Sequence, residues 1–122
     1  MGEDGRPKPG TGWCMLGARE GTDIRVRNGF VDPGHEGISV APGDPAPLSS
    51  RHIPKRLGGR GPYELWSIGV EDLGAKLMCA SYGKSTHGFI EPAYRMTLSD
   101  YQDALAETGA RWRLVNALPN PR

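Results

Sequence analysis

The side chains that could do chemistry in this chain are a serine, a glutamate and several early arginines. Ser39 lies in a short β-branched segment, 38–40, and Glu91 closes the segment 87–91. Cleavage of an N-glycosidic bond needs a carboxylate that hydrogen-bonds the ribose and stabilises an oxocarbenium-like transition state. It also needs a cation that holds a phosphate, for which the sequence offers Arg19, Arg25 and Arg27. The structural alternative is a sheet-edge serine, a solvated glutamate at a strand end and surface arginines.

Several familiar motifs are excluded by their spacing. Gly83-Lys84-Ser85 lacks the glycine that a phosphate-binding loop requires five positions earlier, because Met78 stands there. The glycine run at 58–61 lacks the third glycine and the preceding strand of a dinucleotide fold. The three histidines and two cysteines form no close ligand pair, so we expect no bound metal. No Gly-x-Ser-x-Gly elbow of a serine hydrolase is present either.

Composition indicates one small domain that is rich in loops. The 122 residues include 18 glycines and 11 prolines, but 37% are hydrophobic, with three tryptophans and four tyrosines. That is enough apolar surface for one modest core. The formal net charge is +1, so no bulk field holds the chain on a nucleic acid or an anionic membrane. Cys14 and Cys79 both lie in apolar surroundings, which favours buried thiols over a disulfide.

We expect neither a cleaved signal peptide nor a membrane span from this sequence. Residues 1–10 hold no apolar run of the kind found in a signal peptide, and no segment reaches the roughly 18 apolar residues of a membrane span. We therefore expect action in the cytoplasm of the producing or the target cell, with delivery by a secretion system as an option. Residues 1–10 are expected to form a flexible arm and residues 11–118 a single domain.

The elements that must position these side chains are short strands followed by one helix. A long loop is predicted over 41–62, and Arg27-Asn28-Gly29 is typical of the turns that close hairpins. Extended segments are predicted over 13–18, 24–26, 38–40, 63–70, 77–80 and 87–90.

The last part of the chain has the spacing of a helix. Apolar residues recur every three or four positions from Leu98 to Val115, Thr97 has the features of an N-cap, and Gly109 can shorten the helix. The predicted fold class is α+β, a small curved, mainly antiparallel β-sheet or split sandwich with a C-terminal helix.

A series of motifs between about residues 35 and 108 follows a recognisable order. Gly37-Ile38-Ser39-Val40 is followed by the strand 63–70, then by Thr86-His87-Gly88-Phe89-Ile90-Glu91-Pro92-Ala93, and Met96-Thr97-Leu98 opens the helix. In this order the chain resembles the small type VI secretion effector toxins that have an ADP-ribosyltransferase-like fold. In those toxins a Gly-Thr-Ser strand and a later Thr-His-Tyr strand lead through Pro-Ala and Met into a terminal helix.

The resemblance implies a substrate and a site. The family's glycine and serine fall on Gly37 and Ser39, its histidine on His87, and the aromatic residue that follows on Phe89. The family consumes NAD, by ADP-ribosyl transfer or by NAD hydrolysis, and is held inactive by a cognate immunity or antitoxin protein that occludes the site. A weaker likeness of residues 41–54 to the proline-rich segment of secreted NAD glycohydrolase toxins implies the same substrate.

The sequence and the resemblance together predict a toxin domain that binds and consumes NAD. The predicted catalytic residues are Ser39, His87 and Glu91, and NAD is expected to contact Arg19, Arg25, Gly37, Ser39 and Phe89. One alternative is a metal-independent ribonuclease toxin that uses His35, Lys84 and His87 for acid–base work on a phosphodiester. The other is a non-enzymatic module whose arginines between 51 and 60 bind an acidic partner.

Overall fold

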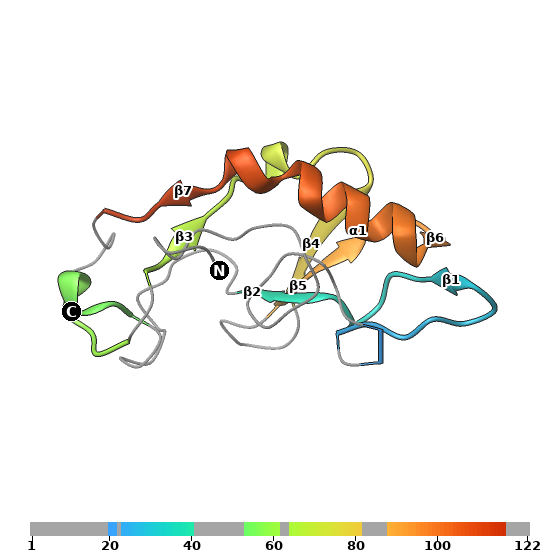
Figure 1. Cartoon of the computed structure of the whole chain (residues 1–122), viewed down its shortest axis with the longest axis horizontal. Coiled ribbons are helices and arrows are strands. Elements are labelled where there is room, and N and C mark those ends of the chain that lie inside the picture. The colour runs from blue at the N-terminus through green and yellow to red at the C-terminus, as the bar shows by residue number, and fades with distance from the viewer. Residues whose placement is uncertain (1–19, 22, 41–52, 62–63, 82–87, 117–122) are drawn as a thin grey trace.

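Three small antiparallel sheets and one α-helix make up the part of the chain that the structure describes (Figure 1). The computed structural model describes residues 20–21, 23–40, 53–61, 64–81 and 88–116. The coarse prediction of an α+β fold with mainly antiparallel strands and a helix near the C-terminus is therefore confirmed.

The strands belong to one central sheet and two flanking pairs. The central sheet has the order β2 (Ile38–Val40), β5 (Gly88–Pro92), β4 (Leu77–Ser81). The flanking pairs are β1 (Phe30–Val31) with β6 (Met96–Thr97), and β3 (Trp66–Ser67) with β7 (Arg113–Leu114). Helix α1 (Leu98–Glu107) follows β6, and short 3₁₀ turns lie at Lys55–Leu57, Val70–Asp72 and Gly109–Arg111.

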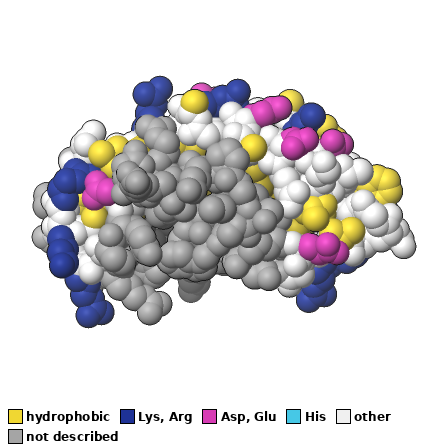
Figure 2. Space-filling model, in the orientation of Figure 1, with side chains coloured by type: hydrophobic (Ala, Val, Ile, Leu, Met, Phe, Trp, Pro, Cys, Tyr) yellow, Lys and Arg dark blue, Asp and Glu magenta, His cyan; other side chains and the backbone are white. Residues whose placement is uncertain are grey.

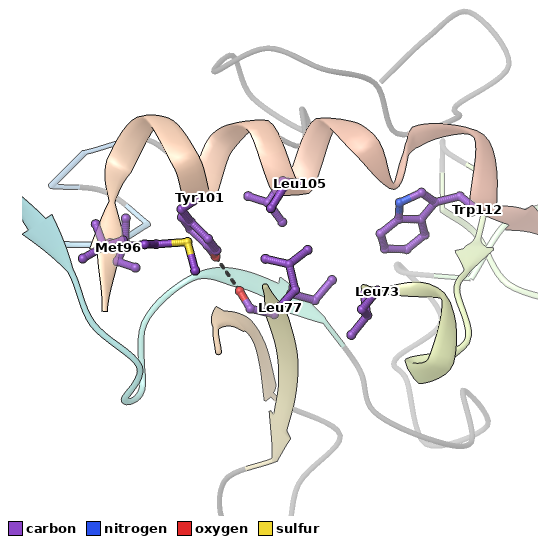
Figure 3. Close-up of a cluster of buried hydrophobic side chains, with 10 residues drawn as sticks. Leu73, Leu77, Met96, Tyr101, Leu105 and Trp112 are labelled. Carbon is purple, nitrogen blue, oxygen red and sulfur yellow. Dashed lines mark hydrogen bonds between the residues drawn. The ribbon is translucent and has the colours of Figure 1, made fainter. Parts of the chain in front are cut away.

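One face of the central sheet packs against α1. Ile90 and Leu77 on this face are buried together with Tyr101 and Leu105 of the helix (Figure 3). The Tyr101 hydroxyl donates a hydrogen bond to the carbonyl oxygen of Ile90. Burial raises the pKa of Tyr101 far above its ordinary value, although a backbone hydrogen bond at Ile38 lowers it. Tyr101 therefore stays a neutral hydroxyl that ties the helix to the middle strand.

The register of the strands determines which side chains lie on the other face of the central sheet. Ser39 pairs with Phe89, and Phe89 pairs on its other side with Ala80. Because successive side chains of a strand point to opposite faces, Ser39, Phe89 and Glu91 share the face that is turned away from α1. This face carries the predicted site residues of β2 and β5.

The helix is shorter than its apolar periodicity predicts. Tyr101, Leu105 and Trp112 are buried as predicted, but α1 ends at Glu107. The Thr108 hydroxyl donates to the Leu105 carbonyl oxygen at 2.7 Å and accepts from the Trp112 indole nitrogen at 3.0 Å. These bonds keep Trp112 in the core although the chain has left the helix, so the periodicity continues past the true end.

Two other predictions differ in their extent. The strand predicted over 63–70 is a strand only at Trp66–Ser67, because the chain turns at Gly69 into a 3₁₀ turn. In the segment 24–26, Ile24 forms a single bridge with Glu20 and no strand. The predicted arm 1–10, the strand 13–18 and residues 41–52 of the predicted loop lie outside the described residues.

The turn before β1 is confirmed. Arg27 and Phe30 exchange backbone hydrogen bonds of 2.8 and 3.0 Å across it. Asn28 and Gly29 have φ angles of 53° and 84°, as a type I′ turn requires at both central positions. No helix within the described ranges has the length and apolar character needed to cross a membrane.

The predicted N-cap of α1 is also confirmed, and its loss has a measurable cost. The Asp100 backbone N–H donates to the Thr97 hydroxyl oxygen at 3.1 Å. Replacing Thr97 by alanine leaves that N–H without its side-chain partner, so we expect T97A to lower the free energy of unfolding by about 1 kcal/mol. Urea denaturation measures this loss. Ser99→Ala, an exposed position in the same turn, is the matched control and should change stability by less than about 0.5 kcal/mol.

Candidate functional site

Ser39 and Phe89 lie side by side on the sheet face that is turned away from α1. They are paired residues of neighbouring antiparallel strands, for which side chains start about 5 Å apart. Ser39 is exposed and Phe89 is half-buried. A hydroxyl beside an aromatic ring on an accessible sheet face can hydrogen-bond and stack a planar, polar ligand.

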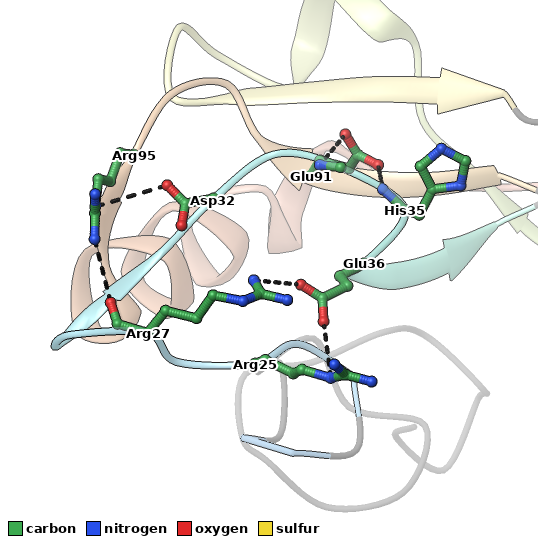
Figure 4. Close-up of polar contacts among 8 residues, drawn as sticks. Arg25, Arg27, Asp32, His35, Glu36, Glu91 and Arg95 are labelled. Carbon is green, nitrogen blue, oxygen red and sulfur yellow. Dashed lines mark hydrogen bonds and ion pairs between the residues drawn. The ribbon is translucent and has the colours of Figure 1, made fainter.

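Glu91, two residues further along β5, is fully buried. Its Oε1 accepts a hydrogen bond from the Gly34 backbone N–H at 3.2 Å, and its Oε2 accepts one from the His35 backbone N–H at 2.9 Å (Figure 4). Burying a carboxylate is costly unless its oxygens receive hydrogen bonds. The structural alternative of a solvated strand end is therefore wrong, because the carboxylate holds the segment 33–37 against the sheet.

Gly37, the last residue of the segment 33–37, is also held in place by close contacts. Its φ is 137°, and its backbone N–H donates to the Asp23 carbonyl oxygen at 2.8 Å. A Cβ atom at this position would overlap the Ile90 carbonyl oxygen and would lie 2.7 Å from the Tyr101 hydroxyl. Gly37 is thus buried against β5, where it allows β2 to approach the middle strand.

A charged cluster borders this segment. Arg25 and Arg27 both face Glu36, with N–O distances of 3.6 and 3.2 Å (Figure 4). The Arg25 side chain is 75% exposed and that of Arg27 48% exposed, so these ion pairs contribute little to stability. Both guanidinium groups are exposed while they face Glu36, and the predicted contact of Arg25 with a phosphate stays a prediction.

Arg95 is not among the residues that the sequence predicts for the site, but it makes several contacts beside the charged cluster. Its guanidinium lies 4.9 Å from the centre of the Phe30 ring, 3.7 Å from an Asp32 oxygen and 3.3 Å from the Arg27 carbonyl oxygen. These contacts join the β1–β6 pair to the turn at residues 27–30. No local sequence pattern predicts these contacts, because residues 95 and 30 are brought together only by the pairing of β1 with β6.

The charged side chains on one face of the described surface are of both signs. Figure 2 shows acidic and basic side chains interspersed over the described part of the face in view. Arg56, one of the arginines expected to meet an acidic partner, lies 2.8 Å from Glu64 and donates to the Val115 carbonyl oxygen. That guanidinium joins two parts of the chain. Arg51 lies outside the described residues, and Arg60 is exposed.

The half-buried Cys79 is unsuited to nucleophilic chemistry. Burial, and after it the negative charge of Glu91, raises the pKa of the Cys79 thiol above its ordinary value. The nucleophilic form of cysteine is the thiolate, so a raised pKa leaves less of it at neutral pH. Within the described ranges, no group of three or more histidine, cysteine, aspartate or glutamate side chains is placed to hold a metal ion.

The remaining predicted residues fall where the structure gives no description. Arg19, Lys84 and His87 lie outside the described residues, as does Cys14. Of the predicted set, the structure brings Ser39, Phe89 and Glu91 onto one face of the central sheet. Gly37 directly precedes β2 and packs against Ile90, and Arg25 belongs to the charged cluster around Glu36.

Comparison with known proteins gave no match. No protein-family model matches the chain, and no curated protein and no solved structure matches it.

Proposed function

We propose that this chain is a toxin domain with an ADP-ribosyltransferase-like arrangement that binds and consumes NAD, by ADP-ribosyl transfer or by hydrolysis. The observation that carries the proposal is the register of β2 on β5, in which Ser39 is paired with Phe89 on the face away from α1. The sequence resemblance assigns both residues to an NAD site, and the register is compatible with one ligand contacting both.

The chemistry of these side chains suits the parts of a dinucleotide. The Phe89 ring offers a face on which nicotinamide can stack, and the Ser39 hydroxyl can donate to and accept from a carboxamide or a ribose hydroxyl. The exposed Arg25 guanidinium is suited to the pyrophosphate, because its planar fork matches phosphate oxygens. His87, which precedes β5, remains a predicted member of the site.

Glu91 has an indirect role in this proposal, because residues 33–37 cover its carboxylate. Direct contact between its carboxylate and a ribose hydroxyl requires residues 33–37 to leave it, which breaks two hydrogen bonds to a charged group. Such bonds contribute about 1.5 to 3 kcal/mol each. We therefore assign Glu91 to holding this segment in place.

The proposed reaction begins at the bond between nicotinamide and C1 of the ribose. That bond breaks with its electron pair moving onto the nicotinamide nitrogen, which leaves as neutral nicotinamide. An oxygen of water or of an acceptor forms the new bond at C1 and loses its proton to the solvent. The positive charge that develops on the ribose makes the transition state oxocarbenium-like.

A pair of serine variants tests the proposal. We expect Ser39→Ala to lower kcat/KM for NAD consumption about tenfold or more, because a hydrogen bond at the reacting end of the ligand is lost. Ser67→Ala, an exposed strand serine in the β3–β7 pair, is the matched control and should stay within about twofold of the wild type. Equal rates for the two variants would contradict the assignment of Ser39. RNA degradation in chelator with NAD untouched would select the ribonuclease alternative.

A further inference from the structure

Two residues other than glycine have a positive φ in the described part of the chain, Asn28 at 53° and His35 at 59°. Asn28 is explained by the type I′ turn, where asparagine is preferred. His35 lies in a segment that already places glycine at positions 34 and 37, and no hairpin requires a histidine there. A side chain kept in the left-handed region at a cost of about 1 kcal/mol or more points to a function.

Buried groups of the central sheet and of α1 fix the backbone on both sides of His35. Glu91 accepts hydrogen bonds from the backbone N–H groups of Gly34 and His35, and Gly37 packs so closely against the Ile90 carbonyl oxygen and the Tyr101 hydroxyl that no Cβ atom fits there. The segment 33–37 is therefore hydrogen-bonded to β5 at residues 34 and 35 and packed against it at Gly37. A segment fixed in this way gives the side chain at its centre a defined position.

The His35 side chain is directed to the outside. His35 is exposed, whereas the carboxylate 2.9 Å from its backbone nitrogen is fully buried. In Figure 4 the His35 and Glu36 side chains leave the chain on opposite sides, and Glu36 turns to the two arginines. The His35 backbone meets the same sheet face as Ser39 and Phe89, because it bonds to Glu91 on that face.

We propose that His35 contacts the substrate at this site, and that Glu91 is the residue that positions it. The inference rests on the proposed function and names a further ligand-binding group for it. The imidazole hydrogen-bonds a ribose hydroxyl or a phosphate oxygen of the dinucleotide. Glu91 contributes through the backbone of residues 34 and 35, without touching the ligand.

Replacing each of the two positive-φ residues by glycine tests the first part. Glycine adopts positive φ without strain, so His35→Gly and Asn28→Gly both remove a side chain while the backbone keeps its conformation. We expect His35→Gly to raise the dissociation constant for NAD and to lower kcat/KM, each about fivefold or more, and Asn28→Gly to leave both within about twofold. Calorimetric titration with NAD and an NAD-consumption assay give the two values.

The double variant tests the positioning role. If Glu91 acts through His35, Glu91→Gln lowers kcat/KM in the wild type and causes little further loss in the His35→Gly background. A purely structural role of Glu91 would give a similar loss in both backgrounds and would overturn this part. If Glu91→Gln does not fold, the two glycine variants still decide the role of His35.

The outcomes separate the two proposals. A wild-type chain that neither binds nor consumes NAD overturns the proposed function, and with it this inference. A wild-type chain that consumes NAD, with His35→Gly at the wild-type rate and affinity, overturns the inference alone.

Discussion

Replacement of Gly37 by alanine is expected to destabilise the fold by about 3 to 5 kcal/mol, which is enough to unfold many small domains. The added Cβ would overlap the Ile90 carbonyl oxygen and would crowd the Tyr101 hydroxyl. Both groups belong to the buried contact between β5 and α1, so neither can move without breaking it. Urea denaturation followed by tryptophan fluorescence measures the change.

Gly34→Ala is the matched control for this variant. Gly34 has a φ of 131°, close to the 137° of Gly37, but a Cβ built on it meets no heavy atom within 4 Å. The backbone strain is therefore similar in both variants, and only Gly37→Ala adds a clash. We expect Gly34→Ala to be clearly less destabilised than Gly37→Ala. Equal losses would show that the close approach of β2 to β5 at Gly37 does not limit stability.

Replacement of Glu91 by glutamine is expected to lower the free energy of unfolding by about 2 to 3 kcal/mol. An amide keeps one acceptor oxygen, and its NH₂ group would face one of the two backbone N–H groups that Glu91 now satisfies. One buried donor then loses its partner. Thermal and urea denaturation both report this loss, and Glu107→Gln at the exposed end of α1 serves as the control. A stability of Glu91→Gln equal to that of the control would contradict the role of the buried carboxylate.

Local signals predicted those parts of the fold that local interactions form. The Asn28-Gly29 turn and the Thr97 cap each involve residues within three positions of one another, and the sequence patterns identify both. The helix boundary was harder to predict, because Trp112 keeps the periodicity of a helix while Thr108 holds it in the core from outside the helix.

The candidate site depends on contacts between residues far apart in the chain. Ser39 and Phe89 are singled out by the sequence, but their pairing follows from a strand register that no local pattern fixes. Glu91 resembles a solvated strand end because nothing near it in sequence supplies donors. Its partners are the backbone N–H groups of residues 34 and 35, more than 50 positions earlier. Pro33, Gly34 and Gly37 are residues typical of turns, but composition does not indicate what the segment covers.

The most direct measurement is the fate of NAD incubated with the purified full chain. Proton NMR resolves free nicotinamide from the nicotinamide of NAD, and denaturation in urea shows separately that the sample is folded. We predict that free nicotinamide appears over time, together with an equal amount of free or transferred ADP-ribose, and that Ser39→Ala slows its release. Unchanged NAD after prolonged incubation with folded wild-type chain, both alone and with a cell extract added as a source of acceptors, would contradict the proposal.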